Sequence, residues 1–189
     1  MRITRPLKAM QALLLVLILF ASIEARGAEI GTAEATIING LIKINANLVI
    51  DPAHISDLDS GFEKEYIFYI DLFRSWTIWP DEFISGTRII RKIKSDPVKK
   101  EYSVRSSTNG KDKEHRFNSL ESMLSEALII KDLALADTRT LLPGDYYVKV
   151  SALSRIRKLA PIVSYLLFFI PDEEFRVEKL TSTFKIQKQ

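Results

Sequence analysis

Hydrophobic and polar positions alternate along residues 41–50. The apolar face of this segment consists of Ile42, Ile44, Ala46, Leu48 and Ile50. Lys43 and Asn45 fall on the opposite face, and Asn39-Gly40 marks a bend before the segment. A period of two with one apolar face predicts a β-strand that is buried on one side.

A different pattern follows at residues 65–76, which are almost continuously apolar and aromatic. Such a run is typical of a central strand buried on both faces. Between the two strands, residues 52–60 have room for about two helical turns, with Gly61 placed to end the helix. Residues 83–94 and 99–106 are predicted to continue the central strand into an antiparallel meander.

Asn109-Gly110 is the strongest hairpin signal in the chain, and it predicts that residues 115–117 pair with the strand before it. A helix is expected next, capped by Asn118 or Ser119, because apolar residues recur there at helical spacing. These residues are Leu120, Met123, Leu124, Ala127 and Leu128. The helix is expected to pack across one face of a sheet.

Three further strands are expected, at residues 145–153, 162–170 and 176–186, the first of them after the turn at Pro143-Gly144. About eight strands separated by turn signals, with one packed helix and one short helix, predict a mainly β fold. We expect an antiparallel β-sandwich or an open barrel.

The first 27 residues are interpreted as an export signal. Arg2, Arg5 and Lys8 precede an uncharged apolar run at residues 9–21. A cut after Ala25 or Gly27 leaves residues 28–189 as a single β-rich domain, and an uncut segment serves as a membrane anchor. Either outcome places the domain outside the cytoplasm, in the periplasm.

Removal of residues 1–27 also changes the charge balance. The segment contains four of the 27 Lys and Arg residues and one of the 24 Asp and Glu residues, so 23 residues of each sign remain. A neutral exported domain gives no reason to expect nucleic acid as a partner. Because the chain has no cysteine, a hydrophobic core and not disulfide bonds must stabilise it.

The sequence contains no motif for a known catalytic or cofactor chemistry. A cysteine nucleophile is excluded, and the seven glycines form neither a Gly-x-Ser-x-Gly nor a Gly-x-Gly pattern. His54 and His115 are the only histidines, and they lack the spacing of metal ligands. We therefore predict no catalytic residue, no metal site and no cofactor.

The most distinctive local feature is a cluster of aromatic and charged residues near the end of the central strand. Its members are Arg74, Trp76, Trp79, Asp81 and Glu82. Such a cluster is suited to a protein interface, but it equally fits a structural plug in which a carboxylate pairs with an arginine. Adjacent carboxylates beside tryptophans also suggest a glycan hydrolase, although successive residues point in opposite directions.

A second candidate surface is basic. Its residues are Arg88, Arg91, Lys92, Lys94, Lys99 and Lys100. The patch could contact anionic lipid, or it could simply protect an edge strand from aggregation. The apolar residues 159–170 are too few to span a bilayer and suggest a buried strand or the wall of a lipid groove.

Four segments together resemble a bacterial family, the domain of unknown function numbered 4390. They are residues 68–83 (FYIDLFRSWTIWPDEF), 99–104 (KKEYSV), 117–127 (FNSLESMLSEA) and 141–150 (LLPGDYYVKV). The resemblance implies an exported protein with no established activity or cofactor. It also implies a link to membrane sensor kinases, because some members of the family are encoded near them. We expect a non-catalytic module that binds an envelope protein, such as a sensor kinase. Lipid binding and glycan hydrolysis are the alternatives.

Overall fold

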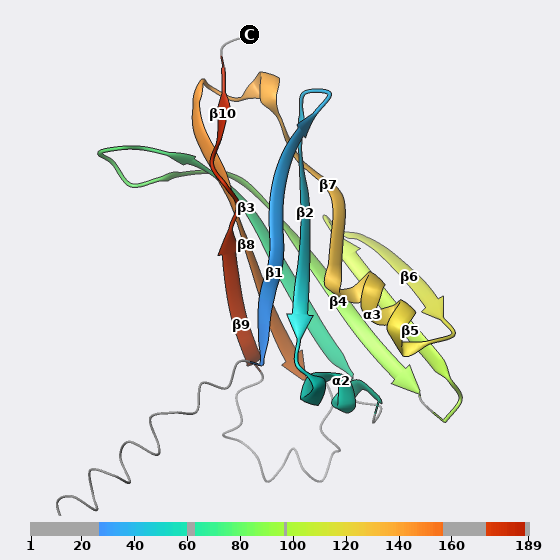
Figure 1. Cartoon of the computed structure of the whole chain (residues 1–189). Coiled ribbons are helices and arrows are strands. Elements are labelled where there is room, and N and C mark those ends of the chain that lie inside the picture. Colours follow the sequence, from blue (N-terminus) through green and yellow to red (C-terminus); the bar gives the residue numbers. More distant parts are fainter. Residues whose placement is uncertain (1–26, 60–62, 97, 157–172, 188–189) are drawn as a thin grey trace, which may run out of the picture.

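The computed structural model of the chain describes residues 27–59, 63–96, 98–156 and 173–187 (Figure 1). These residues form ten β-strands, two α-helices and one short 3₁₀ helix. In chain order the elements are β1 (Ala28–Ile38), β2 (Leu41–Ile50), α2 (Pro52–Asp59), β3 (Lys64–Ser75), β4 (Glu82–Asp96), β5 (Glu101–Thr108), β6 (Lys111–Phe117), α3 (Leu120–Leu128), β7 (Ile129–Asp137), η1 (Thr138–Thr140), β8 (Gly144–Ile156), β9 (Glu173–Leu180) and β10 (Phe184–Ile186).

The strands form two antiparallel sheets that pack face to face. The smaller sheet has the order β1-β2-β7, and the larger has the order β10-β8-β3-β4-β5-β6, with β9 also paired to β8. Figure 1 shows the smaller sheet and α3 on the same side of the larger sheet. The predicted mainly β, antiparallel sandwich is confirmed in its open form, since the described strands do not close into a barrel.

The core lies between the two sheets and is organised around β3, which pairs with β4 on one side and β8 on the other. Alternate side chains of β3 point toward the smaller sheet and are almost completely buried; these are Tyr66, Phe68, Ile70 and Leu72. They pack in one hydrophobic cluster with the apolar faces of β2 and β8. We call this the inner face of the larger sheet, and the opposite side its outer face.

Several local predictions are confirmed. Asn39-Gly40 and Asn109-Gly110 form tight hairpin turns with φ values of 53° and 75°, and of 51° and 76°. Positive φ at both central residues defines the type I′ turn, whose twist matches that of the two strands it joins. Ser119 caps α3, since its side chain accepts a hydrogen bond from Ser122 N–H. Met123, Ala127 and Leu128 are the buried residues of that helix.

The strand count differs from the expected eight because two strands had weak signals. β1 alternates, but with alanines on its inward face, which give little hydrophobic contrast. β7 begins directly after α3 at Ile129, without a glycine or proline to mark the change from helix to strand. The single strand expected at residues 176–186 is divided into β9 and β10. The expected strand at residues 162–170, the helix end at Gly61 and most of the export signal lie outside the described residues.

Arg91 corrects the predicted basic patch. The side chains of β4 alternate, so Arg91 points to the inner face while Arg88, Lys92 and Lys94 do not. Arg91 Nη1 donates to Ala127 O (3.0 Å) and Ile129 O (2.8 Å), where α3 passes into β7. Burial lowers the pKa of Arg91. The two carbonyl groups fix the side chain, and its guanidinium lies over the Phe68 ring.

Replacing this arginine tests its structural role. We expect Arg91→Ala to lower the free energy of unfolding by about 2–4 kcal/mol, because two backbone carbonyls lose a buried donor. The control Arg88→Ala, at an exposed position of the same strand, should cost less than about 1 kcal/mol. Urea unfolding monitored by circular dichroism measures both, and equal costs would contradict the buried role.

Candidate functional site

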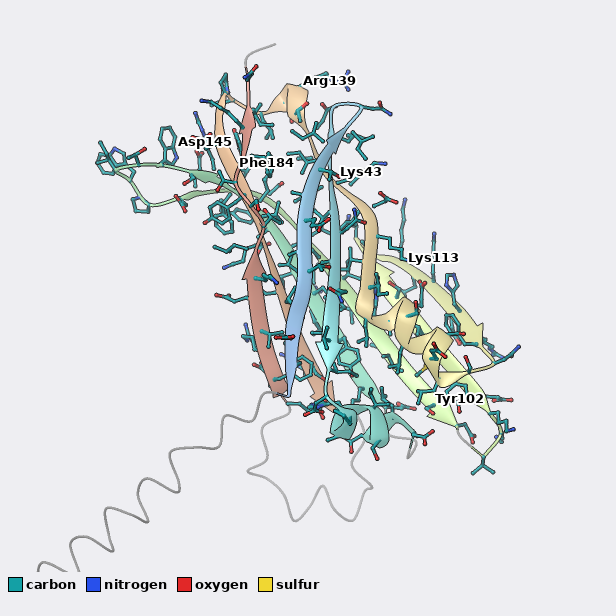
Figure 2. The ribbon with its side chains drawn as sticks, in the orientation of Figure 1. Lys43, Tyr102, Lys113, Arg139, Asp145 and Phe184 are labelled. Carbon is teal, nitrogen blue, oxygen red and sulfur yellow. The ribbon has the colours of Figure 1, made fainter. Side chains whose placement is uncertain are left out.

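The connection between β3 and β4 projects from the body of the sandwich (Figure 1). We call residues 73–83, the strand ends and their turn, the arm. At its apex Ile78 is 87% exposed and Trp79 is 74% exposed, while Trp76 and Phe83 are 43% and 58% exposed. Figure 2 shows that side chains at the end of this connection stand clear of both sheets. The arm therefore presents large apolar side chains to solvent, which is unusual unless they bind something.

Asp81 holds the turn of the arm in one conformation. One carboxylate oxygen accepts a hydrogen bond from Trp76 N–H (3.1 Å), and the other accepts one from the Tyr147 hydroxyl (2.9 Å). These bonds, the backbone one first, hold the pKa of Asp81 below its ordinary value. Asp81 is therefore ionised and structurally occupied, which makes it a poor proton donor for the glycan hydrolase hypothesis.

Arg74 fixes the other side of the arm. Its guanidinium lies over the Trp76 ring, 4.3 Å from the ring centre, and its Nη2 donates to Pro143 O at 2.7 Å. Gly144 permits this close approach, because a Cβ atom there would lie 2.8 Å from Arg74 Nε. The contact joins the arm to the loop before β8, where Leu142 is 65% exposed.

Direct contacts hold three of the five predicted cluster residues, Arg74, Trp76 and Asp81, in the arm. Trp79, the fourth, stands exposed at the apex. Glu82, the fifth, begins β4 opposite Arg74 and is exposed. Asp145, labelled in Figure 2, lies at the base of the same arm because it pairs with Ser75. The arm is therefore a hydrogen-bonded turn with exposed apolar side chains at its apex and charged groups at its base.

The remaining residues of the basic patch lie at some distance from the arm, along β4 and its turn into β5. Three of its lysines have a carboxylate nearby. The Nζ atom lies 4.0 Å from Glu65 Oε2 in Lys92, 3.9 Å from Glu63 Oε1 in Lys94, and 3.6 Å from Asp96 Oδ2 in Lys99. Arg88 and Lys100 are exposed. Because acidic residues accompany most of these lysines, the patch is less positive than its sequence suggests.

Sequence reasoning missed a buried ionic cluster at the end of the sandwich where α2 meets β3. The Lys64 side chain is fully buried, and its Nζ lies 2.8 Å from both Asp57 Oδ2 and Glu174 Oε1. Ser154 Oγ donates to the second oxygen of Glu174 at 2.6 Å. We call Lys64, Asp57, Glu174 and Ser154 the clasp. It joins α2, β3, β8 and β9.

His54 extends the clasp toward the start of β1. Its Nδ1 lies 2.6 Å from Asp51 Oδ1, and its Nε2 lies 3.8 Å from Glu174 Oε1. The hydrogen bond from the His54 side chain is the main cause that lowers the pKa of Asp51. Lys64 and Glu174 are 110 residues apart, so no local sequence signal could have identified their contact.

Within the residues that the structure describes, no group of three or more His, Cys, Asp or Glu side chains is placed to hold a metal ion. The two α-helices they include are too short to cross a membrane. The clasp is partnered internally and is best explained as structural.

The fold defines the protein as a mainly β, antiparallel sandwich with a projecting arm. The chain belongs to the family described as a domain of unknown function, DUF4390, whose sequence model matches residues 25–182. The match includes the arm and the clasp. Comparisons with curated proteins and with solved structures found no match.

The clasp generates a stability prediction. Lys64→Ala removes the cation from between Asp57 and Glu174, so we expect the free energy of unfolding to fall by roughly 3–5 kcal/mol. Lys94→Ala is the matched control, because its side chain is 67% exposed and its ion pair is long; its cost should stay below about 1 kcal/mol. Chemical denaturation measures both, and a Lys64 cost no greater than the control would refute the clasp.

Asp81 generates a pH prediction. Its pKa lies below the ordinary value of 3.8, so its contribution to stability is present above that value and is lost as the pH falls through the folded pKa. Tyr147→Phe removes one of its donors and should raise the pKa of Asp81. Carboxyl ¹³C NMR between about pH 2 and 6 follows this titration. An unchanged Asp81 curve in the variant would contradict the hydrogen bond.

Proposed function

We propose that this protein is a non-catalytic binding module of the cell envelope, exported to the periplasm, and that the arm docks into another protein. The observation that carries the proposal is the exposure of Ile78 and Trp79 on a turn fixed by Asp81. Tryptophan residues in fixed positions are typical centres of binding energy in protein interfaces.

The rigidity of the arm supports this proposal. Hydrogen bonds from Trp76 and Tyr147 to Asp81, and the contact of Arg74 with Pro143, set the turn before any partner arrives. A preorganised surface loses less conformational entropy on binding than a mobile loop. Because the apex of the arm is convex and apolar, its partner should offer an apolar pocket. The ectodomain of a membrane sensor kinase is the partner class that we propose to examine first.

Lipid contact is the competing function, because exposed tryptophans also favour the interface of a bilayer. The arm is less suited to it, since the carboxylates of Asp81 and Glu82 lie directly after the apex. An anionic membrane surface repels such groups. Crosslinking from the apex of the arm in living cells separates protein docking from lipid contact.

A photoreactive amino acid at position 78, introduced into the full chain in living cells, identifies what the apex touches. The control position is Val98, which is 92% exposed in a different turn. We expect one envelope protein to crosslink reproducibly from position 78 and not from position 98. Crosslinks to lipid alone, together with binding to purified vesicles, would overturn the proposal.

Purified partner then provides the quantitative test. Trp79→Ala should weaken binding by about 30-fold or more, as expected for a central aromatic anchor, and it should leave thermal stability nearly unchanged because the side chain contacts little of its own protein. Val98→Ala should change neither quantity. Titration calorimetry measures the affinities. Equal affinity of Trp79→Ala and the wild type would rule out the arm as the docking site.

A further inference from the structure

A second group of side chains lies on the outer face of the larger sheet and includes Phe73 and Phe83, the two end residues of the arm. Asp71 and Phe73 belong to it because they alternate along β3 with residues buried in the core. Strand pairing places Phe83 and Tyr147 on either side of Phe73, and Lys149 next to Asp71. We call these five residues the outer-face cluster. They come from β3, β4 and β8, and none of them belongs to the apex.

The aromatic rings of the cluster support each other. Phe73 and Tyr147 are nearly parallel, with an angle of 12° and a distance of 5.5 Å between ring centres. Phe83 meets Phe73 edge to face at 5.7 Å and remains 58% exposed. Phe83 is therefore an open apolar surface that its neighbours hold in place.

Asp71 is the polar counterpart of this surface. In the contacts of the described residues its carboxylate accepts no hydrogen bond, and partial burial raises its pKa, although the charge of Lys149 acts in the opposite direction. Gly86, its partner on β4, makes room for it, because the carboxylate occupies the place that a Cβ atom at residue 86 would take. A partly desolvated carboxylate without a donor is ready to accept one from a ligand.

Lys149 restricts the chemistry of that ligand. Its Nζ lies 5.4 Å from the centre of the Phe73 ring, so the cluster already contains the cation that its aromatic and acidic groups attract. A second cation would be repelled. A ligand that fits instead needs hydroxyl groups that donate to Asp71 and accept from Lys149, together with a C–H face that packs on Phe83.

Saccharides have this combination of groups. We propose that the outer-face cluster binds a saccharide, with Asp71 and Lys149 on its hydroxyl groups and Phe83 against its ring. The site is non-catalytic, because a single carboxylate flanks the ligand. The saccharide proposal does not rest on the proposal that Ile78 and Trp79 dock into a partner protein.

NMR titration of the purified, ¹⁵N-labelled protein with two neutral probes, triacetylchitotriose and maltotriose, tests the proposal. We expect at least one trisaccharide to shift the amide signals of Asp71, Phe83 and Gly86 with a millimolar dissociation constant. Asp71→Asn should weaken binding about tenfold or more, since it removes a charged acceptor. Glu178→Gln, on the same outer face in β9, is the matched control and should bind as the wild type does.

The outcomes separate the alternatives. Absence of shifts with both sugars at about 50 mM, a concentration well above the expected dissociation constant, overturns the site, and so does equal binding by Asp71→Asn. Shifts with trilysine and not with sugar overturn it in favour of a cationic ligand. Phe83→Ala is the second variant, because the Phe83 side chain is 58% exposed and lies outside the hydrophobic core, and it should also weaken sugar binding. Trp79→Ala should leave sugar binding unchanged. Failure of the docking proposal can therefore be distinguished from failure of the saccharide site.

Discussion

Burial of the inner face of β3 is the interaction on which the remaining structure depends. Tyr66, Phe68, Ile70 and Leu72 are each at most 1% exposed, and the strand that carries them is paired along both edges. Because side chains alternate strictly along a strand, this burial fixes the direction of every other residue of β3. It draws Lys64 into the interior, where the amine needs carboxylate partners, and it turns Asp71 and Phe73 to the outer face.

The arm extends beyond the region that the sandwich core stabilises, and polar contacts replace hydrophobic packing there. Asp81 and Arg74 together bind backbone groups of the turn and of the loop before β8. Their charges are therefore used to shape a surface, while the apolar side chains at the apex remain available. Asp81, one of the two acids that suggested an active site in the sequence, therefore has a structural role in the turn.

The sequence predicted those parts of the fold that depend on local patterns. Alternation in β2, the apolar run of β3, the two Asn-Gly turns and the spacing in α3 were sufficient, since each requires only neighbouring residues. Prediction failed where the decisive contact is remote. Arg91 is basic and lies beside Lys92, but the carbonyl groups that bury it belong to residues 36 and 38 positions away. The clasp and the outer-face cluster likewise require strand pairing across the sheet, which no spacing along the chain reveals.

The position of β8 has a consequence for the order of folding. β3 pairs with β8 from Lys64 opposite Ile156 to Ser75 opposite Asp145, so one edge of the central strand stays open until about 70 further residues have been added. A ribosome or a translocon delivers the chain from its amino end, and an apolar strand with an unpaired edge is prone to aggregation in the meantime. The nascent polypeptide should therefore need a chaperone during that interval, and truncation before residue 144 should leave it permanently dependent on one.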